Sequence, residues 1–191
     1  MNRFLMEFIN LVIRKSYPPV LSPLLKKVLE PYYKLNPHPR EHRLRKSFYY
    51  GKRTKQQGHD FDEIITEKAL KYLNKQGGIR KTQPFCLFLA YNFPHPPYTV
   101  EEPYFSMHER EKLQVISPPN FDDKPLSMRI MRERYGLDKL KEEDFREIRA
   151  TYYGMISKLD FLIGKVVQKL REQGLYENTT ILFLADHGDY A

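Results

Sequence analysis

The sequence is poor in the residues that define several common classes of protein. It has one cysteine and no tryptophan among its 191 residues. A single cysteine excludes a disulfide framework or a cysteine-based zinc cluster within the chain. No apolar run approaches the roughly 18 residues of a membrane-spanning helix, and no repeat with a period of about 20–50 residues is visible. What remains is a globular domain, or a piece of one, with enough apolar residues (41%) for a packed core.

Basic residues outnumber acidic residues by 32 to 24, which gives a formal net charge of +8. They are densest between Arg40 and Lys55, where Phe48, Tyr49 and Tyr50 interrupt the run. Such a stretch suits nucleic acid, an anionic membrane or an anionic substrate. Because no zinc finger or RNA-recognition signature accompanies it, we interpret it as a solvated loop and expect no nucleic-acid partner.

The first residues, Met1–Lys15, have apolar side chains at helical spacing and predict a short amphipathic helix. Glu7 interrupts the apolar run and no small-residue cleavage site follows, so the segment does not have the pattern of a signal peptide. The compartment is therefore left open, cytoplasmic or exported. Residues 16–59 are rich in proline and basic residues, and predict short helices and extended turns with little sheet.

Two longer helices are predicted from periodicity and terminal signals. Asp60 and Glu63 have the spacing of a capping box, and the apolar residues that follow predict a helix over 61–75, which Gly77-Gly78 would stop. A second helix is predicted over 144–173, with Asp144 as the N-cap and Gly174 as the stop. Its interior glycines, Gly154 and Gly164, are explained if the helix packs closely on a neighbour.

Two short apolar runs predict buried strands. Residues 84–91 lie between two prolines, and residues 179–185 follow the second helix. Strands that are apolar on both faces are typical of a parallel or mixed sheet covered by helices, which is the α/β class. Cys86 lies within the first run and is expected to be a buried core thiol.

Polar side chains follow both predicted strands. His95 lies in a proline-rich turn after the first strand, and Asp186-His187-Gly188-Asp189 follows the second. Parallel strands would bring these residues to one edge of the sheet, where ligands bind in open α/β folds. A carboxylate and a neutral imidazole suit a divalent metal, and Asp189 is a further candidate ligand or supporting residue. Taken alone, each of the two motifs is also compatible with a purely structural role.

The order and wording of these segments resemble the sulfatase family of the alkaline phosphatase superfamily. The matching stretches are DFDEIITEKALKYL (60–73), PFCLFLAYNFPHPPY (84–98), EPYFSM (102–107) and ATYYGMISKLDFLIGKVVQKLREQGLYENTTILFLADHGDY (150–190). Residues 1–59 match only loosely. The resemblance implies that residues 1–191 are part of a single sulfatase-like catalytic domain. It also implies a partial alkaline-phosphatase-like three-layer sandwich, with a mixed or mostly parallel sheet flanked by helices.

The resemblance further implies metal-dependent hydrolysis of sulfuric esters, with a sulfated small molecule or sulfated sugar as substrate. Asp186 and His187 match the family's metal ligands, and calcium is the expected ion, with manganese or magnesium as alternatives. His95 matches the family's active-site histidine, which binds a sulfate oxygen or assists the leaving group. Because many sulfatases have Asp-Asn where this chain has Asp-His, a phosphodiester or phosphonate monoester hydrolase is a second reading.

Several family features are absent from these 191 residues. No C/S-x-P/A-S-R motif, the source of the formylglycine nucleophile, occurs in the sequence, and no pair of aspartates follows an apolar strand. We therefore expect an internal fragment that is inactive alone, with formylglycine supplied from an upstream segment. A third reading is a truncated, non-catalytic binding remnant. In a fragment, the strand at 179–185 is expected to expose its apolar side chains.

Overall fold

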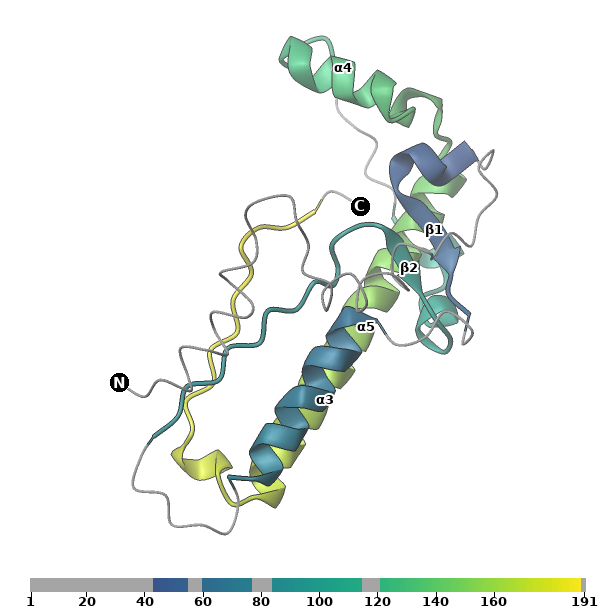
Figure 1. The fold of residues 1–191 in the computed structure, drawn as a ribbon. Helices are drawn as coiled ribbons and strands as arrows, with labels where there is room; N and C mark the ends of the chain where they lie inside the picture. The colour runs from purple at the N-terminus through teal and green to yellow at the C-terminus, as the bar shows by residue number, and fades with distance from the viewer. Residues whose placement is uncertain (1–42, 55–59, 77–83, 115–120, 190–191) are drawn as a thin grey trace, which may run out of the picture. The chain divides into compact units, whose positions relative to one another are not determined.

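The computed structural model describes residues 43–54, 60–76, 84–114 and 121–189 (Figure 1). The chain divides into two compact units, which are described separately. Unit 1 contains the described parts of 57–92 and 162–181, and unit 2 contains those of 36–56, 93–161 and 182–191. The expected N-terminal helix at 1–15 and the Gly77-Gly78 stop lie outside the described residues. Within the described ranges, no helix is both long and apolar enough to cross a membrane.

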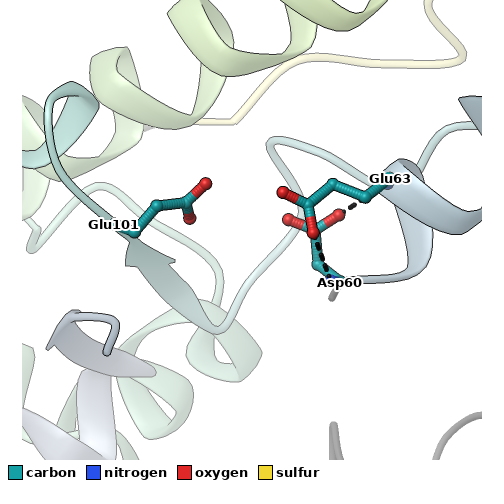
Figure 2. A group of neighbouring side chains, drawn as sticks. All are labelled: Asp60, Glu63 and Glu101. Carbon is teal, nitrogen blue, oxygen red and sulfur yellow. Dashed lines mark hydrogen bonds between the residues drawn. The ribbon is translucent and has the colours of Figure 1, made fainter. Parts of the chain in front are cut away.

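Helix α3 (Phe61–Asn74) begins unit 1 with the predicted capping box. The Glu63 backbone N–H donates to Asp60 Oδ1 at 2.7 Å, and the Asp60 N–H donates to Glu63 Oε2 at 3.0 Å. Figure 2 shows this reciprocal pair at the start of the helix. The two bonds satisfy backbone donors that have no partner within the helix, and so they define its first residue. The predicted bounds of 61–75 are confirmed to within one residue.

Helix α5 (Glu142–Glu172) is the long helix predicted at 144–173. It ends as predicted at Gly174, which has φ +65°. The Gly174 N–H donates to Arg171 and the Leu175 N–H donates to Leu170, a Schellman motif. The prediction for Asp144 was wrong, because the helix begins two residues earlier. Asp144 lies in the first turn, where its Oδ2 accepts the Lys141 N–H at 2.8 Å.

The core of unit 1 lies between α3 and the C-terminal part of α5. Ala69 and Leu73 of α3 pack with Val166 and Leu170 of α5. Three side chains of the extended segment 84–92 lie against this cluster, namely Phe85, Leu87 and Leu89. They alternate with side chains that are exposed, among them Phe88 at 59%. The segment therefore has one packed face and one uncovered face.

The predicted strands at 84–91 and 179–185 are not strands in the structure. A strand is defined by hydrogen bonds to a neighbouring chain segment, and an apolar sequence cannot supply that neighbour. Cys86 points to the uncovered face and is exposed, so the prediction of a buried thiol was wrong for the same reason. The expected exposure of the second run is confirmed, with Leu182, Phe183 and Leu184 exposed at 72–84%.

Unit 2 contains the sheet, formed by strands that the sequence did not predict. Strands β1 (Tyr49–Lys52) and β2 (Tyr98–Val100) pair in parallel, with Tyr49 opposite Tyr98 and Lys52 opposite Val100. The N-terminal part of α5 packs beside them. At Gly154, a Cβ atom would lie 2.4 Å from the Tyr104 carbonyl oxygen and 3.1 Å from Val100 Cγ1. The α/β class is confirmed, and the small parallel sheet with its helices is consistent with part of an alkaline-phosphatase-like sandwich.

The remaining elements of the described chain are short. Helix α4 (Leu126–Arg134) has no buried residue. The 3-10 helices are Arg43–Ser47, Tyr104–Ser106, Arg110–Lys112, Leu137–Lys139 and Tyr176–Asn178.

Candidate functional site

His95 lies in the turn that precedes β2, and its side chain is exposed. Its Nδ1 atom lies 2.6 Å from the carbonyl oxygen of Pro96. Because a carbonyl oxygen only accepts, Nδ1 carries the proton in this arrangement. In the neutral ring Nε2 is then the nitrogen with the lone pair, the atom that can accept or deliver a proton.

The segment leading to this turn is anchored by α3 within unit 1. The Asn92 backbone N–H donates to Asp62 Oδ1 at 2.8 Å, and the Asp62 side chain is almost fully buried. One turn further along the helix, the Thr66 hydroxyl lies 3.1 Å from the Tyr91 hydroxyl. These two contacts hold the end of the extended segment, three residues before His95.

Within unit 2, a buried ion pair supports the first residue of the turn. Lys158 of α5 is only 1% exposed, and its Nζ atom lies 2.5 Å from Glu101 Oε1. The same ammonium lies 5.7 Å from the ring centre of Phe93, within cation–π range. Arg53 lies 3.9 Å from the other carboxylate oxygen of Glu101. The sequence analysis gave none of these charged residues a role in the site. The position of a lysine among the apolar residues of a helix does not show whether its side chain is buried.

Asp186 and His187 lie in unit 2, on the exposed segment 182–189. His187 Nε2 lies 3.8 Å from Asp186 Oδ2, and the His187 N–H donates to Asp186 Oδ1 at 2.9 Å. His187 Nδ1 lies 2.8 Å from the Gly188 carbonyl oxygen, which only accepts a hydrogen bond, so Nδ1 carries the proton. In the neutral ring the lone pair is then on Nε2, the nitrogen that lies 3.8 Å from Asp186 Oδ2. The hydrogen bond to Gly188, together with the charge of Asp186, raises the pKa of His187 above its usual value.

Asp189 joins this segment to the sheet and to α5. The Tyr98 hydroxyl of β2 donates to Asp189 Oδ2 at 2.5 Å. Burial raises the pKa of Tyr98, and the hydrogen bond and charge of Asp189 raise it further. The pKa of Tyr152 on α5 is also raised, first by burial and then by the charge of Asp189, while a backbone hydrogen bond from Asp189 opposes the rise. Sequence reasoning missed both tyrosines, since nothing in their spacing distinguishes them from core aromatics.

The structure brings the predicted site residues together in part. Asp186 and His187 are neighbours, and their potential metal-ligand atoms, Oδ2 and Nε2, lie 3.8 Å apart. The hydrogen bond from Tyr98 to Asp189 joins their segment to the strand that follows His95. Among the described residues, no hydrogen bond or ion pair joins His95 directly to Asp186 or His187. The shared sheet edge expected from two adjacent parallel strands is not formed by the segments 84–91 and 179–185.

The chemistry of the Asp186–His187 pair fits a divalent cation. A carboxylate oxygen and a neutral imidazole nitrogen are both good ligands, and their 3.8 Å separation lets one ion contact both. The number of ligands is low, because calcium takes about six to eight oxygen ligands. Asp186 and His187 would therefore provide part of a metal site rather than all of it.

Comparison with known proteins identifies the family. The sulfatase family model matches residues 25–191, most of the chain. The chain therefore belongs to the sulfatase family of the alkaline phosphatase superfamily, a family of sulfuric ester hydrolases that are generally metal dependent. This confirms the resemblance on which the expected fold and chemistry were based.

Individual relatives agree with this assignment. The chain is 33% identical over 141 residues to the multifunctional alkaline phosphatase superfamily protein PehA of Trinickia caryophylli, covering 66% of this chain and 27% of that protein. It is 30% identical over 146 residues to arylsulfatase K of Gallus gallus (68% and 27%). It is 31% identical over 142 residues to the choline-sulfatase of Rhizobium meliloti (71% and 28%). The aligned part of the chain thus spans little more than a quarter of each relative.

Proposed function

We propose that the complete gene product hydrolyses sulfate esters and that Asp186 and His187 bind its divalent cation. Calcium is the first candidate ion, with manganese or magnesium as alternatives, and the substrate is a sulfated small molecule or a sulfated sugar. The observation that carries the proposal is the facing pair of Asp186 Oδ2 and His187 Nε2 in a chain of the sulfatase family. When bound, the cation would stabilise negative charge on the sulfate oxygens.

The proposed role of His95 follows from its tautomer. With Nδ1–H donating to Pro96, Nε2 is the atom that can hold or deliver a proton. A protonated Nε2 would donate to a sulfate oxygen or to the departing alkoxide, which carries charge only as the ester bond breaks. Phe93, two residues before His95, is buried against Lys158 and anchors the start of the turn.

A phosphodiester or phosphonate monoester hydrolase is the second candidate. His187 stands where many sulfatases have asparagine, and one relative is named a multifunctional member of the alkaline phosphatase superfamily. An inactive binding remnant is the third candidate, supported by the absence of the formylglycine motif from these 191 residues. Fold alone does not discriminate among these functions.

Turnover of matched aryl sulfate, phosphate diester and phosphonate monoester substrates by the complete gene product tests the proposal. We expect the sulfate ester to have the highest kcat/KM. Chelation should abolish turnover, and added calcium should restore it better than manganese or magnesium. His95→Ala should lower kcat by about 100-fold or more, the usual contribution of a general acid. The chain of residues 1–191 alone should show no turnover above its His95→Ala variant.

His108→Gln is the matched control, because His108 belongs to the same unit but contacts Ser157 on α5. It should leave kcat within about 2-fold of the unmodified protein, as expected for a residue away from the reacting atoms. Activity that survives chelation, or Asp186→Ala and His187→Ala variants with unchanged metal affinity, would contradict the metal assignment. A higher kcat/KM for the phosphate diester or phosphonate would favour the second candidate.

A further inference from the structure

We propose that Tyr98 and Tyr152 are positioning residues for the metal-binding pair, and that they act through Asp189. The proposal rests on the proposed role of Asp186 and His187, and it adds the part of the protein that holds these ligands in place. Neither tyrosine would touch the substrate or the cation.

The first contact joins Asp189 to the sheet. Tyr98 is the first residue of β2, it is 7% exposed, and β1 pairs with it through Tyr49. Its hydroxyl donates to Asp189 Oδ2 at 2.5 Å, a short bond of the kind expected between a neutral donor and a carboxylate. A buried phenol on a paired strand is a rigid donor, so the carboxylate it binds has a defined position.

The second contact supports this bond from α5. The rings of Tyr98 and Tyr152 pack edge to face, with centroids 6.1 Å apart. The Tyr98 hydroxyl thus holds the Asp189 side chain, and Tyr152 of the helix packs against the ring that carries this hydroxyl.

These contacts matter because the rest of the segment is exposed. Leu182, Phe183 and Leu184 are at least 72% exposed, and the side chains of Asp186 and His187 are 91% and 74% exposed. In the described part of the chain, the hydrogen bond that joins residues 182–189 to another segment is the one from Tyr98 to Asp189. Asp189 lies two residues after His187, so fixing it restricts the conformations of both ligands. Ligands that are already ordered lose less entropy when a cation binds.

Hydrogen exchange on the metal-free complete gene product tests the contacts themselves. Tyr98→Phe and Tyr152→Phe each remove one hydroxyl and keep the ring. Both should speed exchange of the backbone amides of residues 186–189, and Tyr98→Phe should act more strongly, because it removes the hydroxyl that donates to Asp189. Tyr72→Phe is the matched control, because Tyr72 packs against Phe85 in unit 1 and should leave this segment unchanged.

Metal affinity tests the positioning role. Equilibrium dialysis with calcium and with manganese should give dissociation constants about 10-fold higher for Tyr98→Phe, the lower end of the effect of residues that orient metal ligands. Asp189→Ala should match Tyr98→Phe, and the double variant should be no weaker than either single variant. Asp189→Asn keeps an oxygen acceptor for the Tyr98 hydroxyl and should recover most of the affinity. With saturating metal, kcat should return toward that of the unmodified protein while KM stays the same.

Unchanged exchange at residues 186–189 in both tyrosine variants would overturn the inference. So would faster exchange with unchanged metal affinity, since the contacts would then exist without positioning the ligands. The Asp186→Ala variant separates the inference from the proposed function. If Asp186→Ala loses the cation and Tyr98→Phe does not, the metal assignment stands and the positioning role fails. If the unmodified protein binds no cation, both fail.

Discussion

Tyr49 and Glu147 form a partly buried polar contact between the sheet and α5 in unit 2. The Tyr49 hydroxyl donates to Glu147 Oε1, and Arg110 Nε donates to the other oxygen of that carboxylate at 2.8 Å. Tyr49 is only 4% exposed. Burial raises the pKa of Tyr49 well above its usual value, and the hydrogen bond and charge of Glu147 add to the rise. Tyr49 and Arg110 share the Glu147 carboxylate, so an ionised Tyr49 would lie beside its negative charge.

This arrangement predicts a loss of stability at high pH. The folded protein binds the Tyr49 proton more tightly than the unfolded chain, whose tyrosines titrate near pH 10. The contribution is therefore fully present below pH 10 and is lost as the pH rises above it. Each such tyrosine adds a slope of about 1.4 kcal/mol per pH unit to the unfolding free energy. Urea denaturation between pH 9 and 12 should show a shallower decline for Tyr49→Phe, and parallel curves would contradict the assignment.

At the scale of elements, α5 has two interior glycines with different surroundings. Gly154 faces the Tyr104 carbonyl at a separation that a Cβ atom cannot adopt without moving backbone. Gly164 is exposed, and a Cβ there would have no neighbour within 4 Å. The close-packing explanation suggested by the sequence is thus confirmed for Gly154 and wrong for Gly164 in the described structure.

The two glycines form a matched pair of substitutions. Gly154→Ala should lower the unfolding free energy by about 1–3 kcal/mol, because overpacking against backbone outweighs the gain in helix propensity. Gly164→Ala should raise it by about 0.5–1 kcal/mol, because alanine reduces the entropy of the unfolded chain and nothing opposes its methyl group. Chemical denaturation of both variants measures the difference. Equal effects at the two positions would contradict the packing at Gly154.

Helices and strands differed in how far the sequence predicted them. The bounds of α3 and α5 followed from apolar spacing together with the Asp60 cap and the Gly174 stop, all of which act within a few residues. The strands did not follow, because β1 and β2 are short and lack an apolar run. Their pairing depends on a contact between residues about 50 positions apart. The stronger apolar runs at 84–91 and 179–185 have no strand partner among the described residues.

At the scale of the whole molecule, each of the two units exposes apolar side chains on an extended segment. Ile181, Leu182, Phe183 and Leu184 follow one another with 47–84% of each side chain exposed, and Phe88 in the other extended segment is 59% exposed. Consecutive exposed apolar residues are rare in soluble monomers and mark surfaces that another segment covers. The aligned residues span about a quarter of each relative.

The chain of residues 1–191 should therefore bind the dye ANS and self-associate. Leu182→Ser combined with Leu184→Ser should reduce both, because the two substitutions remove the most exposed apolar side chains of the segment. Leu126→Ser on α4 changes an apolar side chain outside this segment that is 63% exposed, and serves as the control. Fluorescence titration and sedimentation velocity measure the two properties. A monomeric chain without dye binding would contradict the prediction.

The sequence by itself determined the family, the two long helices with the Asp60 cap and the Gly174 stop, and the Asp186–His187 pair that we propose to bind the metal. These depend on interactions within a few residues, or on motifs read directly from the chain. Only the tertiary structure decided which segments pair as strands, that Cys86 is exposed, and that Lys158 is buried against Glu101. It also decided that Tyr98 binds Asp189 across 91 positions. The physical reason is that a paired strand, a buried charge and the hydrogen bond from Tyr98 to Asp189 each require a partner distant in the chain. The spacing of residues within a short stretch of sequence does not identify that partner.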